Sequence, residues 1–302
     1  MNWSQRIAKL PTAKFDSAVL FLLLGVSACS LCLSSPAKIL AQQPFAPSQS
    51  YLGFDLNTYP GDTALSVLRK TFSFGGYWLN APPGTKQNTW LGKRQRMLSE
   101  KLGFLILFNG PQSGELKSPT QAVSRGTADA ATAISMAKKE GFPPGAIMFL
   151  DIEEGGRLPP KYHAYLRTWA DALARARYGA GVYCSGMPVS EGQGVTIKTA
   201  DDIRNHRAKR DLAYFIYNDA CPPSPGCVVP HNPLPPSASG IPYAAVWQFA
   251  QSPRRKEFTA HCAATYNPDG NCYVPGDTAH AWFLDLNSAT SPDPSNGRDG
   301  AP

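Results

Sequence analysis

Short apolar runs recur along most of the chain and predict β-strands. Each of eight runs is six to eight residues long, and several, such as Phe104–Phe108, are apolar almost throughout. Continuous apolar runs suit strands that are buried on both faces, as in a parallel sheet. The predicted strands are Tyr51–Asn57, Phe74–Asn80, Phe104–Asn109, Ala146–Glu153, Gly179–Ser185, Leu212–Asp219, Ala244–Phe249 and Ala281–Asn287.

Helical patterns lie between the earlier strands. The clearest is the stripe from Tyr162 to Leu173, where apolar residues recur every three or four positions. Strands that alternate with helices predict an α/β fold, and eight strands in about 240 residues predict a closed (β/α)8, TIM-like barrel. The last third of the chain lacks such stripes, so we expect its helices to be degenerate. An open doubly wound sheet is the alternative, although no G-x-G-x-x-G follows the first strand.

The start of the chain has the pattern of an export signal. Basic residues precede the apolar stretch Ala18–Leu33, and small residues follow it, which predicts a signal over residues 1–41. The apolar stretch is marginal for a bilayer span. We therefore expect a secreted or periplasmic protein. The sequence Val26–Cys29 is similar to a lipobox, so a lipoprotein tethered to the membrane through a lipid on Cys29 remains an alternative.

The remaining chain divides into three parts by composition. A linker rich in Pro, Gln and Ser covers residues 42–50, and the predicted barrel covers 51–289. Residues 290–302 are rich in Ser, Pro, Asp and Gly, which predicts a disordered tail.

The cysteines of the predicted barrel agree with export. Cys221 and Cys227 span one loop-like segment, and Cys262 and Cys272 span another. We expect two local disulfides that pin these loops, and a buried, unpaired Cys184.

Charge and motifs exclude several function classes. The net charge is +7, and the densest basic run, Arg254–Lys256, has no neighbouring aromatic ladder, so no nucleic acid partner is expected. The histidines form no H-E-x-x-H pair and no Walker A sequence occurs, so we expect no metal and no cofactor. We expect a monomer.

Acidic side chains follow several predicted strands, at the end where a (β/α)8 barrel carries its active site. Asp151 and Glu153 stand two apart on one strand and share a face, so one of the two carboxyls should have a raised pKa and serve as a general acid. Asp55 and Asp285 each begin an Asp-Leu-Asn at the ends of the first and last strands. Four acids around one barrel mouth suit the cleavage of a glycosidic bond.

Other strand-end residues are placed to contact a sugar. For any one of them alone, a strand cap or a place in the core is the more common role, and the set as a whole favours a functional cleft. The predicted substrate-binding residues are Asn57, Tyr77, Trp78, Asn109, Tyr183, Trp247, Gln248 and Asn287.

Several of these segments resemble a known family. The stretch from Gly53 to Gly186 resembles the bacterial glycoside-hydrolase-like domain of exported mycobacterial and other envelope proteins, long regarded as a domain of unknown function. That family commonly has Arg before the Tyr of the second strand, where this chain has Gly76. The segments that carry the resemblance are Gly53–Asp55, Gly75–Leu79, Gly126–Ala130, Ala133, Ala137, Gly141–Pro143, Asp151–Glu153 and Gly181–Tyr183.

The whole predicted barrel is similar, more distantly, to the Chalaropsis-type lysozymes, the peptidoglycan muramidases of glycoside hydrolase family 25. The resemblance implies that Glu153 is the general acid/base and that Asp151 orients the substrate's 2-acetamido group or stabilises positive charge at the anomeric carbon. It implies that Asp55 and Asp285 tune this pair and bind sugar hydroxyls. Trp247-Gln248 and Asn287 match the family's late Trp-Gln and its final Asp-x-Asn.

Together these observations predict an exported hydrolase of a β-linked amino-sugar polymer, in the first place peptidoglycan, that works by carboxylate acid/base catalysis. Its expected partner is a cell-wall or envelope glycan. The alternative is a catalytically silent envelope protein that binds the glycan without cutting it.

Overall fold

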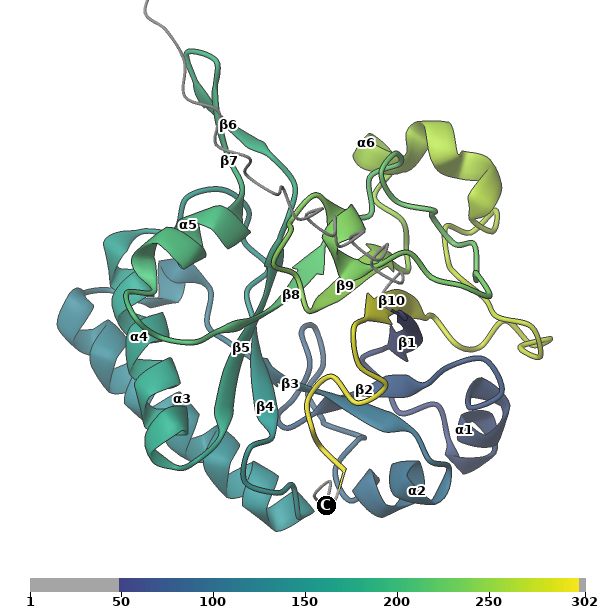
Figure 1. The fold of residues 1–302 in the computed structure, drawn as a ribbon, viewed down its shortest axis with the longest axis horizontal. Coiled ribbons are helices and arrows are strands. Elements are labelled where there is room, and N and C mark those ends of the chain that lie inside the picture. Colours follow the sequence, from purple (N-terminus) through teal and green to yellow (C-terminus); the bar gives the residue numbers. More distant parts are fainter. Residues whose placement is uncertain (1–48, 299–302) are drawn as a thin grey trace, which may run out of the picture. The chain divides into compact units, whose positions relative to one another are not determined.

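In the computed structural model, which describes residues 49–298, eight strands close into a barrel (Figure 1). The predicted export signal, nearly all of the predicted linker and residues 299–302 lie outside this range. Around the barrel the strands follow the order β1-β10-β9-β8-β5-β4-β3-β2. Their bounds are β1 Tyr51–Asp55, β2 Phe74–Trp78, β3 Gly103–Asn109, β4 Ile147–Asp151, β5 Gly179–Ser185, β8 Ala213–Tyr217, β9 Val246–Ala250 and β10 Asp285–Ala289. The predicted α/β barrel is confirmed.

The last strand runs opposite to the others, which the sequence did not predict. Strand β10 pairs antiparallel with both β1 and β9, whereas the other neighbouring pairs are parallel. Asp285 therefore starts β10 at the barrel mouth, opposite Asp55, which ends β1. The strand also begins four residues later than predicted, because residues 281–284 belong to the loop that leads the chain back to the mouth.

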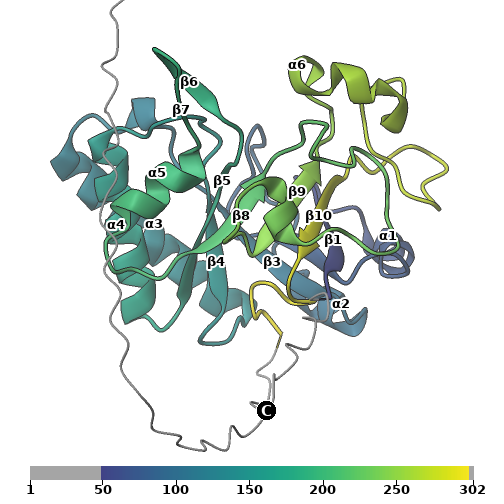
Figure 2. The same cartoon turned by 45° about the horizontal axis from the view of Figure 1, so that its top comes forward.

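Helices cover the first part of the barrel, and loops cover the rest (Figures 1 and 2). Between β8 and β9 the chain makes one short 3-10 turn, and between β9 and β10 it makes one short helix and one 3-10 turn, so the expected degeneration of the late helices is confirmed. The helices are α1 Asp62–Leu68, α2 Arg94–Ser99, α3 Pro119–Glu140, α4 Pro160–Arg175, α5 Thr199–His206 and α6 Lys256–Thr259, with 3-10 turns at Ser113–Glu115, Pro236–Ser239 and Ala260–Thr265. A small hairpin of β6, Val189–Gly192, and β7, Val195–Ile197, follows β5.

The two longest helices, α3 and α4, lie side by side on the outside of the barrel (Figure 1). The Ser118 hydroxyl caps the start of α3 by accepting from Gln121 N at 3.2 Å, and Gly141 ends it with a left-handed backbone. Gly126 allows the close approach of the helices, since a Cβ there would lie 2.6 Å from the carbonyl oxygen of Tyr165.

Two disulfides join the loop after β8 to the loop after β9. They link Cys221 to Cys262 and Cys227 to Cys272, with Cα–Cα distances of 5.9 and 5.3 Å. The predicted local pairing is therefore wrong: β8 and β9 are parallel neighbours, so the loops that follow them start at the same end of the barrel and their cysteines meet. Among the described residues Cys184 is buried and unpaired, as predicted.

Residues 290–298 pack against the base of the barrel, where a disordered tail was predicted. The Ser295 hydroxyl and the Asp293 carboxylate accept from the backbone N–H groups of Ile106 and Phe104, each at 2.8 Å. Only a glycine fits at position 103, because a Cβ there would lie 1.9 Å from the carbonyl oxygen of Pro292. The polar composition of this segment thus supplies hydrogen bonds to the amino ends of the strands. Within residues 49–298 no helix has the length and apolar character that a membrane span requires.

Candidate active site

Two hollows meet at the mouth of the barrel. One has a volume of about 220 Å³ and is lined by residues that include Asp55, Trp78 and Asp285. The other, of about 250 Å³, is lined by residues that include Asn109, Glu154 and Tyr162. Pro83, Asp151 and Glu153 line both. Two of the predicted catalytic carboxyls, Asp151 and Glu153, therefore stand where the two hollows adjoin, and the two hollows together are called the groove below.

The alternation of side chains along each strand decides which residues reach this groove. On β2 Trp78 points inward and lines the first hollow, while Tyr77 points outward. On β9 Gln248 points inward, while Trp247 packs outward against Phe249.

Asp55 and Asp285 share one hydrogen-bond donor. Gln248 Nε2 donates to the Oδ2 atoms of both carboxyls, each at 3.2 Å. Asn287 Nδ2 donates to Asp55 Oδ2 at 2.7 Å, and Ser252 N donates to Asp285 Oδ1 at 2.6 Å. The structure thus brings the first and last predicted acids together and holds both by amide donors.

The orientation of the Gln248 amide is fixed from its other side. Its Oε1 accepts from the Tyr183 hydroxyl at 2.6 Å and from Gln251 Nε2 at 2.7 Å. Burial raises the pKa of Tyr183 well above its ordinary value, so its phenol remains a donor. With its oxygen occupied by two donors, Gln248 must turn its nitrogen towards the carboxyls.

Burial shifts the acids of this cluster towards their neutral forms. It raises the pKa of Asp55 to about 6, although the hydrogen bonds from Asn287 and Gln248 work in the opposite direction. Burial, and next the charge of Asp55, raise the pKa of Asp285 well above its ordinary value. This cluster therefore retains protons at pH values where exposed aspartates have lost them.

Asp151 ends β4, and Glu153 follows two residues later. Asp151 is 5% exposed, and burial, followed by the charge of Glu153, raises its pKa well above the ordinary value. Among the described residues its Oδ1 has no hydrogen-bond partner. Glu153 lies just beyond the strand and is exposed, with its backbone oxygen held by the Tyr217 hydroxyl at 3.0 Å. The pair therefore combines one buried carboxyl, whose pKa is raised, with one that solvent reaches.

Three more predicted residues lie at the groove. Trp78 is buried, and its indole Nε1 has no hydrogen-bond partner in the part of the chain that the structure describes. Asn57 lines the first hollow and donates to Pro83 O at 3.0 Å. Asn109 lines the second hollow, and its side chain donates to Ala81 O at 3.0 Å. Both amides thus also fix the loop that borders the groove.

Three predicted substrate-binding residues do not reach the groove. Tyr77 is fully buried on the outer side of the barrel, where its ring packs against Trp90 and Phe142 and its hydroxyl bonds to Glu140. Trp247 is likewise buried outside the barrel, and its indole donates to Asn218 O at 3.0 Å. The prediction failed because two neighbouring residues of one strand cannot both face inward.

Asn287 is the third of these residues, and its place differs from that of the two aromatic rings. It is fully buried inside the barrel. It lies two residues after Asp285 on β10, and it is farther from the mouth because β10 starts at the mouth and runs towards the base. Its amide supports Asp55 rather than a ligand.

The groove also contains residues that the sequence analysis missed. Arg255 lies over the Tyr217 ring, 4.7 Å from the guanidinium carbon to the ring centroid, and donates to Gln251 Oε1 at 2.5 Å. Its Nε lies 3.9 Å from a carboxylate oxygen of the buried Asp219. The sequence analysis noted the basic run Arg254–Lys256, which contains Arg255. Nothing in the composition of this run indicated that one of its residues lies at the barrel mouth.

The acids of the mouth do not form a metal site by their arrangement. Within residues 49–298 the group of side chains whose ligand atoms converge as a metal ion requires is His163, Asp202 and His206, which line neither hollow. The groove itself offers carboxyls, amides and aromatic rings, which suit acid/base chemistry on a polar, hydroxyl-rich substrate.

Comparison with known proteins agrees with this fold. Residues 76–219 match the model of the family described as the Rv2525c-like, glycoside hydrolase-like domain, which confirms the resemblance found in the sequence. No curated protein sequence matches the chain.

Three solved structures illustrate the likeness of the fold. An uncharacterized protein of B. stearothermophilus is 17% identical, with 79% of this chain and 95% of that chain covered and a TM-score of 0.50. The Mycobacterium tuberculosis Tat-secreted protein Rv2525c, in complex with L-tartrate, is 15% identical, with 81% and 97% covered and a TM-score of 0.48. The catalytic domain of the endolysin ply40 from bacteriophage P40 of Listeria monocytogenes is 15% identical, with 80% and 93% covered and a TM-score of 0.45.

Proposed function

We propose that this barrel, which carries an Rv2525c-like, glycoside hydrolase-like domain over residues 76–219, hydrolyses a β-linked amino-sugar polymer of the cell envelope, in the first place peptidoglycan. The observation that carries the proposal is the placement of Asp151 and Glu153 at the junction of the two hollows. A polymer that occupies both hollows has one of its glycosidic bonds beside these carboxyls.

Glu153 is the general acid/base of the proposed reaction. It donates a proton to the glycosidic oxygen as the bond from that oxygen to the anomeric carbon breaks, and the departing sugar leaves as an alcohol. Water then adds to the anomeric carbon and returns a proton to Glu153. Its exposure at the groove allows both the leaving oxygen and water to reach it.

Asp151 orients the 2-acetamido group of the substrate. Its Oδ1 is buried without a hydrogen-bond partner among the described residues, which is costly unless a substrate supplies one. The N–H of a 2-acetamido group would meet this need, which favours an amino-sugar over a plain glucan. Asp55 and Asp285 lie deeper and set the local charge beside Asp151.

Export is part of the same proposal. The two disulfides between the loops after β8 and β9 form in oxidising compartments outside the cytosol. An exported barrel meets the envelope glycan directly, in agreement with the signal predicted over residues 1–41.

A second candidate function, binding without cleavage, has one observation in its favour. The family resemblance implies an Arg at the position of Gly76, and here a Cβ at that position would lie 2.5 Å from the Cβ of Asp55. A side chain larger than that of glycine does not fit at this position. This barrel therefore lacks the positive charge that an Arg would place beside Asp55.

One experiment separates the two functions. We would incubate the full chain, Glu153→Gln and the control Glu257→Gln, an exposed carboxyl on α6, with purified peptidoglycan and measure new reducing ends and co-sedimentation. Release by the wild type and by Glu257→Gln but not by Glu153→Gln supports the hydrolase. Co-sedimentation without release by any of the three supports the binding protein, and neither release nor binding contradicts both.

A further inference from the structure

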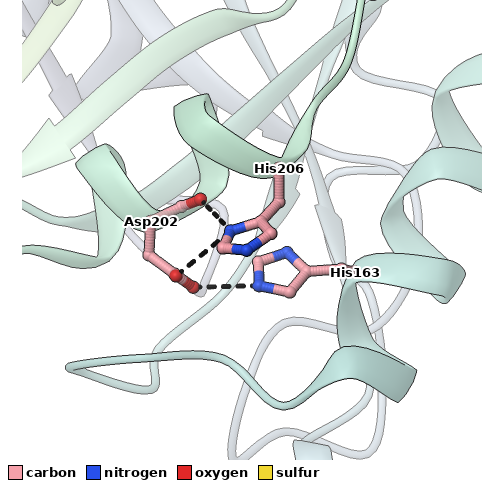
Figure 3. A group of neighbouring side chains, drawn as sticks. All are labelled: His163, Asp202 and His206. Atoms are coloured by element: carbon pink, nitrogen blue, oxygen red, sulfur yellow. Dashed lines mark hydrogen bonds and ion pairs between the residues drawn. The ribbon is translucent and has the colours of Figure 1, made fainter.

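Three side chains outside the groove converge between helices α4 and α5 (Figure 3). His163 Nε2, from α4, lies 3.0 Å from Asp202 Oδ2. His206, one turn after Asp202 on α5, places its Nδ1 3.3 Å from Asp202 Oδ1. One ring nitrogen from each histidine and one carboxylate oxygen of Asp202 all lie within 4.8 Å of one another.

One oxygen of this cluster has no hydrogen bond. Asp202 Oδ1 is buried and has no hydrogen-bond partner among the described residues. The other oxygen, Oδ2, accepts from Leu158 N at 2.9 Å and lies 3.0 Å from His163 Nε2. A buried carboxylate oxygen without a hydrogen bond is costly unless a further partner completes it.

We propose that His163, Asp202 and His206 bind a divalent transition-metal ion, with Zn²⁺ as the best fit. Two imidazole nitrogens and a carboxylate oxygen are ligands that Zn²⁺ takes in proteins at about 2.0–2.2 Å. His206 Nδ1 lies 2.8 Å from the backbone oxygen of Asp202, which can only accept, so Nδ1 donates there and Nε2 is the nitrogen left for the ion.

The surroundings fit a metal in two further ways. The oxygen Oδ2 of Asp202 is already oriented by a backbone N–H, as metal-binding carboxylates commonly are. The side chain of His206 is 46% exposed, so an ion and a water molecule as fourth ligand can reach the cluster from solvent.

Arg167, Arg207 and Arg210 line the hollow beside His163 and His206, and Arg157 is the cation that pairs with Asp202. Arg157 Nη1 is 3.7 Å from Asp202 Oδ1, too long for a strong ion pair. The same guanidinium donates two hydrogen bonds to Glu191 on the hairpin β6–β7, at 2.9 and 2.8 Å. Glu191 therefore holds Arg157, and a metal ion competes for Asp202 without leaving Arg157 unpaired.

The bound ion would join two helices that lie on the outside of the barrel. Asp202 and His206 both belong to α5, and His163 is the ligand from α4. Its expected effect is therefore on stability, independent of any reaction at the groove.

The test is calorimetric titration of the full chain with Zn²⁺, together with the visible absorption spectrum of the Co²⁺-loaded chain. We expect one ion per chain and the intense bands of tetrahedral Co²⁺ with nitrogen and oxygen ligands. His206→Gln removes a half-exposed ligand, so it should keep the fold by circular dichroism and weaken Zn²⁺ binding at least about 100-fold. His163→Gln should weaken it similarly. His231→Gln, which removes an exposed histidine elsewhere, should bind as the wild type does.

We also expect Zn²⁺ to raise the midpoint of thermal unfolding of the wild type and of His231→Gln. The midpoint of His206→Gln should not rise. The proposal is overturned if the chain binds no Zn²⁺ or Co²⁺. It is equally overturned if His206→Gln binds as tightly as the wild type, or if His231→Gln loses as much affinity as His206→Gln does.

Discussion

Asp55 and Asp285 stand directly opposite each other in the antiparallel pair of β1 and β10, with the side-chain nitrogen of Gln248 bonded to both carboxyls. A single donor cannot compensate two buried negative charges, so ionising one of them makes ionising the other harder. Both aspartates therefore have raised pKa values, and the charge of Asp55 in turn acts on Asp151.

The first prediction concerns the pH dependence of folding stability. The pKa of Asp55 is raised by burial from 3.8 to about 6. Because the folded state holds this proton more tightly than the unfolded state, the contribution is complete below about pH 4 and is lost as the pH rises through about 6. Between pH 4 and pH 7 the wild type should lose about 2–3 kcal/mol of unfolding free energy through this group.

Asp55→Asn cannot titrate, so its unfolding free energy should not share this loss. Urea unfolding of both chains at pH 4, 5, 6 and 7 measures the difference. A difference between the two free energies that stays constant across this range would contradict the assignment of the proton to Asp55.

The second prediction concerns Gln248 as a positioning residue. Gln248→Leu keeps the approximate volume but removes one hydrogen bond each from the Tyr183 hydroxyl, Asp55 and Asp285, which should cost about 2–3 kcal/mol. The hydrogen bond from Gln248 lowers the pKa of Asp55, so its removal should raise that pKa further. Carboxyl titration by ¹³C NMR checks the shift. An unchanged titration beside a loss of stability would mean that Gln248 serves packing alone.

The third prediction concerns the indole of Trp78. Its Nε1 is buried at the groove without a partner among the described residues, so Trp78→Phe removes an N–H that contributes nothing to the unbound fold. We expect about a tenfold weaker binding of glycan fragments, in line with the loss of one hydrogen bond, and little change in the thermal midpoint beyond the smaller ring.

Trp169 provides the matched control for this variant. It is also fully buried, its Nε1 also has no partner among the described residues, and it packs against Phe108 away from the groove. Trp169→Phe should leave glycan binding unchanged. Equal losses of binding in the two variants would indicate a general effect on the fold.

The fourth prediction concerns the two disulfides. Each closes a long segment, with 41 and 45 residues of separation, and together they tie the loop after β8 to the loop after β9. Replacing Cys227 and Cys272 by Ser should lower the unfolding free energy by about 2–4 kcal/mol. Chemical unfolding of this variant and of Cys184→Ser, the matched unpaired cysteine, gives the comparison. A larger loss from Cys184→Ser would show that core packing outweighs the cross-link.

The barrel was predictable because several strands are apolar runs, and the polar residue that ends a parallel strand falls at the mouth. Asp55 and Asp151 could be placed in this way without knowing any contact. The direction of β10, Asp-Leu-Asn-Ser-Ala, could not be predicted, since the alternation of side chains along a strand is the same in either direction. The long loop before Asp285 returns the chain to the mouth, and only this geometry forces the strand to run downward.

The aromatic residues show where the sequence reasoning went wrong. Tyr77 and Trp78 are neighbours on one strand, so the pleat sends one of them into the helix layer. The same alternation separates Trp247 from Gln248. Applying the two-residue period to each strand, rather than counting rings near its end, would have selected Trp78 and Gln248. Arg255 lies on an irregular loop, where no such period exists.

The position of β10 between β1 and β9 also governs the order in which this chain can fold. Until residues 285–289 arrive, β1 and β9 are two unpaired sheet edges, each with a row of free backbone donors and acceptors. A nascent or truncated chain that ends before residue 285 therefore has an open sheet with two exposed edge strands, which can pair with other chains. Closure joins β1 to β10, so it requires residues 285–289, and Asp293 and Ser295 then bond to the base of the barrel.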